Sequence, residues 1–238
     1  MVFIIEISLG KCWYQQQTNN WGVIKIRLLQ KLRIKRLHQK HLNEHNIKHF
    51  SKLVSSAWKE DPLIQALIPK AKERRQFLYA YKKFLVTLGF LKGEIYTTED
   101  HKSIAVWYPS TASNFDLKDL IKADIGEMIR NTNLVLLLKL LKMNRLTGKM
   151  HKKHAPFPHW YLSQIAVEPQ TQNTGMGSFL LQQKFRNKEN WPLYCDVSNE
   201  RARKFYEKHG FKVVDSTVLD KKHVLYAMIR YPESDLNS

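Results

Sequence analysis

Cysteine is scarce in this chain, with Cys12 and Cys195 as the two examples among 238 residues. Disulfides therefore do not hold the fold together, which excludes a small secreted domain stapled by such bonds. A reducing, cytoplasmic setting is compatible with this usage. Cys195 stands in an apolar, strand-like stretch without a histidine beside it, so we interpret it as a buried, inert thiol rather than a nucleophile.

Long hydrophobic runs are also missing. The apolar stretch at residues 1–7 is too short to span a membrane and lacks the basic region that opens a signal peptide. Another apolar stretch, Leu134 to Leu141, is interrupted by Lys139 and followed by Lys142, which is typical of an amphipathic helix. We therefore expect no membrane span.

Acidic residues are few relative to basic ones. The chain has 21 Asp and Glu against 39 Lys and Arg, a formal net charge of +18. Such a surface attracts anions, among them nucleic acids, acidic proteins and lipid headgroups. Residues 1 to 40 hold eight of the basic side chains and a single Glu. We interpret this segment as a solubilising or nonspecific basic arm and disfavour a dedicated nucleic-acid site.

Metal-ligand patterns are not evident. The ten histidines are scattered, and their closer pairs lack nearby cysteines or a convincing third ligand. We expect no metal.

What the chain does have is a glycine-containing turn between two apolar runs. Residues 172–177 read Gln-Asn-Thr-Gly-Met-Gly, after a strand-like run that ends at Pro169 and before a helix-like run. Glycines let backbone amides approach a ligand, and the first N–H groups of a helix favour an anion such as a diphosphate. Two glycines near a helix start are more often a plain tight turn, so this motif alone is weak.

Two known phosphate loops do not fit this turn. A dinucleotide fingerprint needs Gly or Ala where Leu180 stands, and a P-loop needs Gly-Lys-Ser/Thr where the chain has Gly177-Ser178.

A second block strengthens the signal. From Asn199 to Phe211 the chain reads Asn-x-x-Ala-x-x-Phe-Tyr-x-x-x-Gly-Phe. Together with Gln-x-x-Gly-x-Gly, this block resembles the Gcn5-related N-acetyltransferases (GNAT), which use acetyl-coenzyme A. The resemblance is strong from Trp160 to about Met228 and looser from Arg33 to Tyr108. In this second part, Glu60-Asp61-Pro62 and the strand end at residues 105–109 resemble the puromycin-acetyltransferase-like branch.

The resemblance implies an α/β (α+β) fold. We expect a GNAT-like mixed, mostly antiparallel sheet flanked by helices, with a two-helix insert between strands 3 and 4. The expected parts are a basic N-terminal extension (1–30), the acetyltransferase domain (31–231) with its insert at 110–156, and a tail (232–238).

Hydrophobic periodicity places the elements. We expect one or two strands within residues 24–37, then strands at 94–98, 103–108, 160–167, 193–197, 211–218 and 224–231. We expect helices at 44–61, 70–91, 117–130, 134–150, 175–187 and 200–209.

The resemblance also implies a cofactor site. The backbone of Ile165, Ala166 and Val167 would bind the pantetheine arm as an added strand would. The pyrophosphate would meet Gln172, Asn173, Thr174, Gly175, Met176, Gly177 and Ser178. Asn199 would contact the cofactor between strands four and five, and it could also cap the helix that begins at Glu200; the two roles are compatible.

Catalytic candidates follow from the same comparison. Tyr206 corresponds to the tyrosine that contacts the cofactor and protonates the leaving thiolate, although core packing is the alternative. Asp196 is the candidate base, with His159 and Glu168 as weaker candidates and ordered water as another option. An amide of strand four could polarise the carbonyl.

The expected function is acetyl-CoA-dependent N-acetyl transfer to the amine of a small molecule, by direct transfer in a ternary complex. Two alternatives stay open: a CoA-binding regulatory protein without turnover, and a basic module for nucleic acid or an acidic partner. The acceptor is not specified, and the protein could be a monomer or a homodimer.

Overall fold

The computed structural model describes residues 34–112, 115–185, 188–220 and 222–232. The expected basic extension at 1–30, with any strand before residue 34, lies outside the described residues, as does the tail beyond Pro232.

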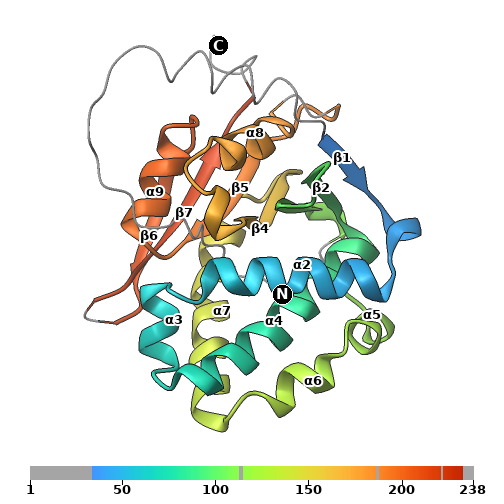
Figure 1. Cartoon of the computed structure of the whole chain (residues 1–238). Helices are drawn as coiled ribbons and strands as arrows, with labels where there is room; N and C mark the ends of the chain where they lie inside the picture. The colour runs from blue at the N-terminus through green and yellow to red at the C-terminus, as the bar shows by residue number, and fades with distance from the viewer. Residues whose placement is uncertain (1–33, 113–114, 186–187, 221, 233–238) are drawn as a thin grey trace.

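Seven strands form one sheet in the order β1-β2-β3-β4-β5-β7-β6 (Figure 1). Every neighbouring pair is antiparallel except β4 and β5, which run parallel. The predicted mixed, mostly antiparallel sheet is confirmed. The strands are β1 (Ile34–Leu37), β2 (Glu94–Thr98), β3 (Ser103–Pro109), β4 (Trp160–Val167), β5 (Leu193–Val197), β6 (Lys212–Val218) and β7 (Val224–Arg230).

Two long helices, α2 (Glu44–Trp58) and α4 (Ala71–Lys92), pack on each other and on the central strands. Asn43 caps the start of α2, because its side-chain oxygen accepts a hydrogen bond of 2.8 Å from the N–H of Asn46. Apolar residues at helical spacing along both helices are buried against the sheet. The predicted periodicity therefore identified the faces that form the core.

A short helix between them, α3 (Pro62–Leu67), was not predicted. The Asp61 carboxylate accepts from the N–H of Ile64 at 2.9 Å, and Pro62 occupies the first helical turn, where a missing N–H costs nothing. An Asp-Pro pair that we interpreted as the end of one helix is thus the start of another.

The described residues of the insert between β3 and β4 form three α-helices rather than two: α5 (Leu117–Lys122), α6 (Ile125–Arg130) and α7 (Leu134–His154). The prediction of one helix from 117 to 130 is wrong. Asp124 adopts a left-handed backbone with φ of 59°, and its carboxylate caps α6 by accepting from the N–H of Glu127. A residue that caps a new helix breaks the old one.

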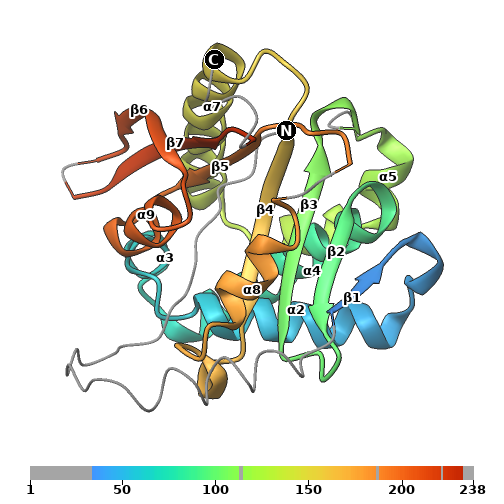
Figure 2. The same ribbon diagram turned by 90° about the horizontal axis from the view of Figure 1, so that it is seen from above.

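The helices form two layers around the sheet. Helices α2 to α7 lie below the sheet in Figure 1, while α8 (Met176–Gln182) and α9 (Glu200–Glu207) lie above it. Figure 2 shows α8 lying along β4. Short 3-10 turns occur at Gln39–His41, Ser110–Ala112 and Pro169–Thr171. One apolar cluster runs through both layers and forms the main core.

Candidate functional site

The centre of the sheet opens between β4 and β5. These strands pair at two positions, Trp160 with Leu193 and Tyr161 with Tyr194, and form no further pairs within the described chain. Beyond this point β4 remains paired with β3, and β5 remains paired with β7. The backbone of β4 from residue 162 to 167 therefore has one edge without a strand partner, and such an edge can accept an extended ligand.

A bulge lies where the two strands part. Val106 of β3 faces Gln164, and the next residue, Trp107, faces Leu162, so Ser163 is an extra residue in β4. A bulge re-aims backbone groups away from the regular ladder. We expected an amide donor in this strand, but the sequence does not indicate its position. A bulge depends on pairing with a strand that is distant in the sequence.

The glycine turn follows β4 and leads into α8. Gln172 Nε2 donates to the Val167 carbonyl at 3.1 Å, and Thr174 Oγ1 donates to the Thr171 carbonyl at 2.7 Å, so the turn is closed on itself. Asn173 and Gly175 both have a positive φ, of 64° and 94°. The predicted helix starts one residue after Gly175 and ends at Gln182, earlier than expected.

This turn orients backbone donors in one direction. The first N–H groups of α8, at Met176, Gly177 and Ser178, have no carbonyl within the helix to bind. A Cβ at Gly177 would meet Phe205 at 3.7 Å and Val167 at 3.8 Å, which are ordinary contacts. Packing alone therefore does not require glycine at 177, whereas the left-handed backbone favours it at 175.

Asn199 connects the two layers at the open end of β5. Its side-chain oxygen accepts from the N–H of Ala202 at 2.7 Å and caps α9, which is the alternative role that the sequence left open. Its amide nitrogen donates to Asp61 Oδ2 at 3.4 Å. Asp61 itself is 6% exposed and was not among the predicted site residues. The Asp-Pro pair was the available signal, but it does not reveal a contact 138 residues away.

Tyr206 is fully buried on α9. Its ring packs edge-on against Phe205 and Phe211, with centroid distances of 5.4 and 5.3 Å. Phe205 in turn lies beside Gly177 at the start of α8. The predicted acid thus belongs to the same cluster as the glycine turn, and it also has the core role that was its alternative.

Asp196 lies in a sealed polar network on β5. Its two oxygens accept hydrogen bonds from Tyr194 at 2.9 Å and from Tyr161 at 3.3 Å, and its side chain has no exposed surface. Burial raises the pKa of Asp196 from 3.8 to about 8, against the opposing effect of the two tyrosine hydroxyls. At neutral pH the carboxyl is therefore mostly protonated.

The two tyrosine rings stack on His151 of α7, which contacts His159. His159 Nδ1 donates to the Phe157 carbonyl at 2.7 Å, so its Nε2 accepts from His151 Nε2 at 2.6 Å. Burial lowers the pKa of both rings, that of His151 to about 3. His159 is thus a neutral, enclosed group. The third candidate base, Glu168, is the half-buried residue that follows β4, where its N–H donates to the Lys102 carbonyl.

Among the residues that the structure describes, no group of three or more His, Cys, Asp or Glu side chains could hold a metal ion. None of the helices described is both long and apolar enough to cross a membrane.

Comparisons with known proteins agree with this architecture. Residues 139–213, from α7 through α9 to the start of β6, match the family model described as the acetyltransferase (GNAT) domain. A Corynebacterium glutamicum structure described as histone acetyltransferase HPA2 and related acetyltransferase is 16% identical, with a TM-score of 0.55 over 84% of this chain and 96% of its own. Arylalkylamine N-acetyltransferase 2 from Aedes aegypti is 13% identical, with a TM-score of 0.52 over 84% of this chain and 99% of its own.

At such identities the structural likeness shows the fold alone, and the match to the family model is confined to residues 139–213. The matched segment covers the open strand edge, the glycine turn and both helices of the upper layer. The chain is therefore similar to GNAT acetyltransferases in fold over most of its length and in sequence over residues 139–213.

Proposed function

We propose that the protein is an acetyl-CoA-dependent N-acetyltransferase that acylates the amine of a small molecule by direct transfer in a ternary complex. One observation carries this proposal. The strands β4 and β5 part beside the glycine turn, whose backbone N–H groups begin α8, and both features lie within the segment that matches the family model. That arrangement suits a ligand that is partly extended chain and partly diphosphate.

The residues present fit acetyl-CoA, which would supply an acetyl thioester. The unpaired edge at Ile165, Ala166 and Val167 would hold the pantetheine arm by backbone hydrogen bonds. The amides from Asn173 to Ser178 would face the pyrophosphate, at the positive end of α8. Asn199, two residues after β5 ends at Val197, would contact the cofactor from the β5 side of the opening.

Acetyl transfer forms a bond between the amine nitrogen and the acetyl carbon and breaks the bond to sulfur. A β4 amide at the Ser163 bulge would stabilise the negative charge that develops on the acetyl oxygen. Tyr206 would donate its proton to the departing thiolate, since a phenol is acidic enough to protonate a thiolate at neutral pH. The amine nitrogen loses a proton in the same step, which requires a base.

We propose Asp196 as that base, acting through Tyr161, because Asp196 and Tyr194 have no exposed surface whereas Tyr161 is 5% exposed. A carboxylate whose pKa is about 8 accepts a proton far more readily than an ordinary one, but it is available only as the pH approaches that value. Asp61, which contacts Asn199 at the open end of β5, is the second candidate.

The similarity in fold to an arylalkylamine N-acetyltransferase supports a small amine as the acceptor. The similarity in fold to a protein described as a histone acetyltransferase makes a lysine side chain the alternative acceptor. We also propose residues 31–231 as the catalytic domain and a cytoplasmic setting, which the low cysteine content supports. The Glu60-Asp61-Pro62 motif supports placement in the puromycin-acetyltransferase-like branch.

The direct test is release of free CoA from acetyl-CoA in the presence of a panel of amines and a lysine-containing peptide. We expect acetyl-CoA to bind at micromolar concentration and thiol release to depend on a small amine. Binding without turnover of any acceptor would favour a regulatory protein. Absence of both would contradict the proposal.

A further inference from the structure

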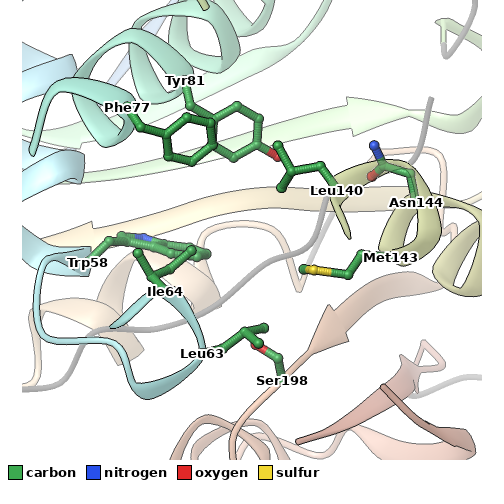
Figure 3. Close-up of a pocket in the computed structure, with 9 residues that line it drawn as sticks. All are labelled: Trp58, Leu63, Ile64, Phe77, Tyr81, Leu140, Met143, Asn144 and Ser198. Carbon is green, nitrogen blue, oxygen red and sulfur yellow. The ribbon is translucent and has the colours of Figure 1, made fainter. Parts of the chain in front are cut away.

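A small cavity lies between the lower helices and the open end of β5 (Figure 3). Side chains of α2, α3, α4 and α7 form its walls, and Ser198, which directly follows β5, forms its edge. The lining residues are Trp58, Leu63, Ile64, Phe77, Tyr81, Leu140, Met143, Asn144 and Ser198.

The cavity walls are apolar and aromatic. Seven of the nine lining side chains are aliphatic, aromatic or thioether groups, and none is a carboxylate or an ammonium. The rings of Phe77 and Tyr81 lie nearly parallel, with centroids 5.4 Å apart, and form one wall in Figure 3. An interior of this kind binds a hydrocarbon group. It offers no partner to a ligand that carries a second charged group into it.

Two polar atoms on these walls have no hydrogen-bond partner among the described residues: Ser198 Oγ and Trp58 Nε1. Both belong to buried residues, with exposed fractions of 4% and 3%. Buried polar atoms are normally paired, so an orphaned hydroxyl and an orphaned N–H at one cavity indicate a missing partner. That partner would be a mostly apolar ligand with a polar group.

The cavity is on the opposite side of the sheet opening from the glycine turn. Ser198 marks the end of β5, and on the other side Trp58 connects to β4 through Lys82. The Lys82 ammonium lies 3.1 Å from the Trp58 ring centroid and donates to Gln164 of β4 at 3.0 Å. The cavity therefore reaches the end of β5 at Ser198 and is linked to β4 through Lys82, which contacts both Trp58 and Gln164.

A wider pocket of about 360 Å³ adjoins the cavity and shares Leu63 and Ser198 with it. Asn199 also lines this outer pocket. A molecule that entered here would pass Asn199 and Ser198 before it reached the apolar walls.

We propose that the cavity is the acceptor subsite and that the acceptor is a primary amine on a short aromatic or branched aliphatic frame. This inference rests on the proposed function. The frame would lie among Trp58, Phe77 and Met143, and the amine would remain at Ser198, beside the opening. Polyamines and amino sugars would leave charges or hydroxyls unpaired against these walls.

Met143 would set the size limit. The free space is about 20 Å³, enough for roughly one water molecule, so a ring enters by displacing side chains. Met143 is unbranched and adapts its shape easily, and it is buried at 4% exposure on the cavity-facing side of α7.

The test measures kcat and KM for 2-phenylethylamine, 3-methylbutylamine and putrescine, together with the Kd for acetyl-CoA. We expect kcat/KM to be at least about tenfold higher for the two apolar amines than for putrescine, in line with the discrimination that apolar pockets provide. Met143→Trp should raise the KM for 2-phenylethylamine by about tenfold and leave the Kd for acetyl-CoA unchanged. Leu138→Trp, on the exposed side of the same helix, is the matched control and should change neither value.

Ser198→Ala gives a second readout, since it removes a hydroxyl without adding bulk. It should raise KM severalfold for every amine while acetyl-CoA still binds. A kcat/KM for putrescine that equals or exceeds that of the apolar amines would overturn the subsite alone. An unchanged KM for 2-phenylethylamine in Met143→Trp would do the same. A wild-type protein that neither binds acetyl-CoA nor acetylates any amine would overturn the proposed function first.

Discussion

Asp196 is a carboxyl group whose surroundings determine its chemistry. Two tyrosine hydroxyls satisfy its oxygens, but complete burial outweighs them and raises its pKa to about 8. The folded protein therefore holds a proton on Asp196 between pH 4 and 8, a range in which the unfolded chain has released it. Because the folded state binds more protons there, stability falls as pH rises through this range.

Asp196→Asn should remove this pH dependence. The variant keeps a neutral hydrogen-bonding group, so it should be more stable than the wild type at pH 8 to 9, by on the order of a few kcal/mol, with little difference near pH 4. Urea unfolding at several pH values measures this. Parallel stability curves for the two proteins across the range would rule out the raised pKa.

The same group gives a kinetic prediction. If Asp196 accepts the amine's proton, kcat should rise with pH and level off above about 8. Asp196→Asn should lose this rise of kcat with pH and most of its activity. Rates measured over the pH range with saturating acceptor test this. Asp61→Asn is the comparison, because an Asp61 base would place the loss of activity in that variant instead.

Tyr206→Phe separates catalysis from packing. The ring contacts with Phe205 and Phe211 would remain, so the fold should be retained. Loss of the proton donor should lower kcat by about 10²-fold with little change in the Kd for acetyl-CoA. Thiol release and thermal unfolding measured side by side provide the check. Full turnover in this variant would leave Tyr206 with the packing role alone.

At the scale of elements, Asn199 and Asn43 offer a matched pair. Each caps a helix by accepting from an N–H three residues on, at 2.7 and 2.8 Å. Replacement of either by Ala should cost about 1 kcal/mol of stability. Asn199→Ala alone should also weaken acetyl-CoA binding, because α9 borders the opening. Equal affinity in both variants would limit Asn199 to capping.

The glycine turn gives the second element-scale prediction. Gly175→Val forces a β-branched residue into a left-handed backbone, with φ of 94°, and would displace the amides that face the pyrophosphate. We expect a loss of acetyl-CoA affinity of at least about tenfold, consistent with disturbing several charge-assisted hydrogen bonds. Gly126→Ala in the insert is the control, since its methyl would meet the flexible end of Arg130. Titration calorimetry compares the two.

The sequence predicted elements well where local signals were strong. Hydrophobic periodicity located α2 and α4, and it placed β2 and β3 to within one residue. The prediction failed where an aspartate could either lie within or end one helix, or begin another. Asp61 starts α3, and Asp124 starts α6 and so divides the predicted first helix of the insert. Capping geometry depends on a single backbone angle, which composition does not reveal.

The sequence also located part of the candidate site. Its motif residues lie on β4, the glycine turn and α9, next to the point where β4 and β5 part, and their roles there stay predictions. The Ser163 bulge, the contact between Asn199 and Asp61, and the cavity at Ser198 arise from segments far apart in the chain. No local pattern encodes such contacts, so they required the folded structure.

At the scale of the whole molecule, we propose that each of the two helix layers binds a different ligand. The upper layer, α8 and α9, faces the proposed cofactor, and the lower layer, α2, α3, α4 and α7, forms the proposed acceptor cavity (Figure 1). The parted strands are the place where both ligands can meet. Direct transfer requires such a shared opening, since donor and acceptor must be present together.

The most direct test of this arrangement is a crystal structure of the protein with coenzyme A. The account predicts the pyrophosphate within hydrogen-bond distance of the amides at 173–178 and the pantetheine arm alongside Ile165 to Val167, with its sulfur between β4 and β5. Coenzyme A bound elsewhere, with the strand edge and the glycine turn unoccupied, would contradict it.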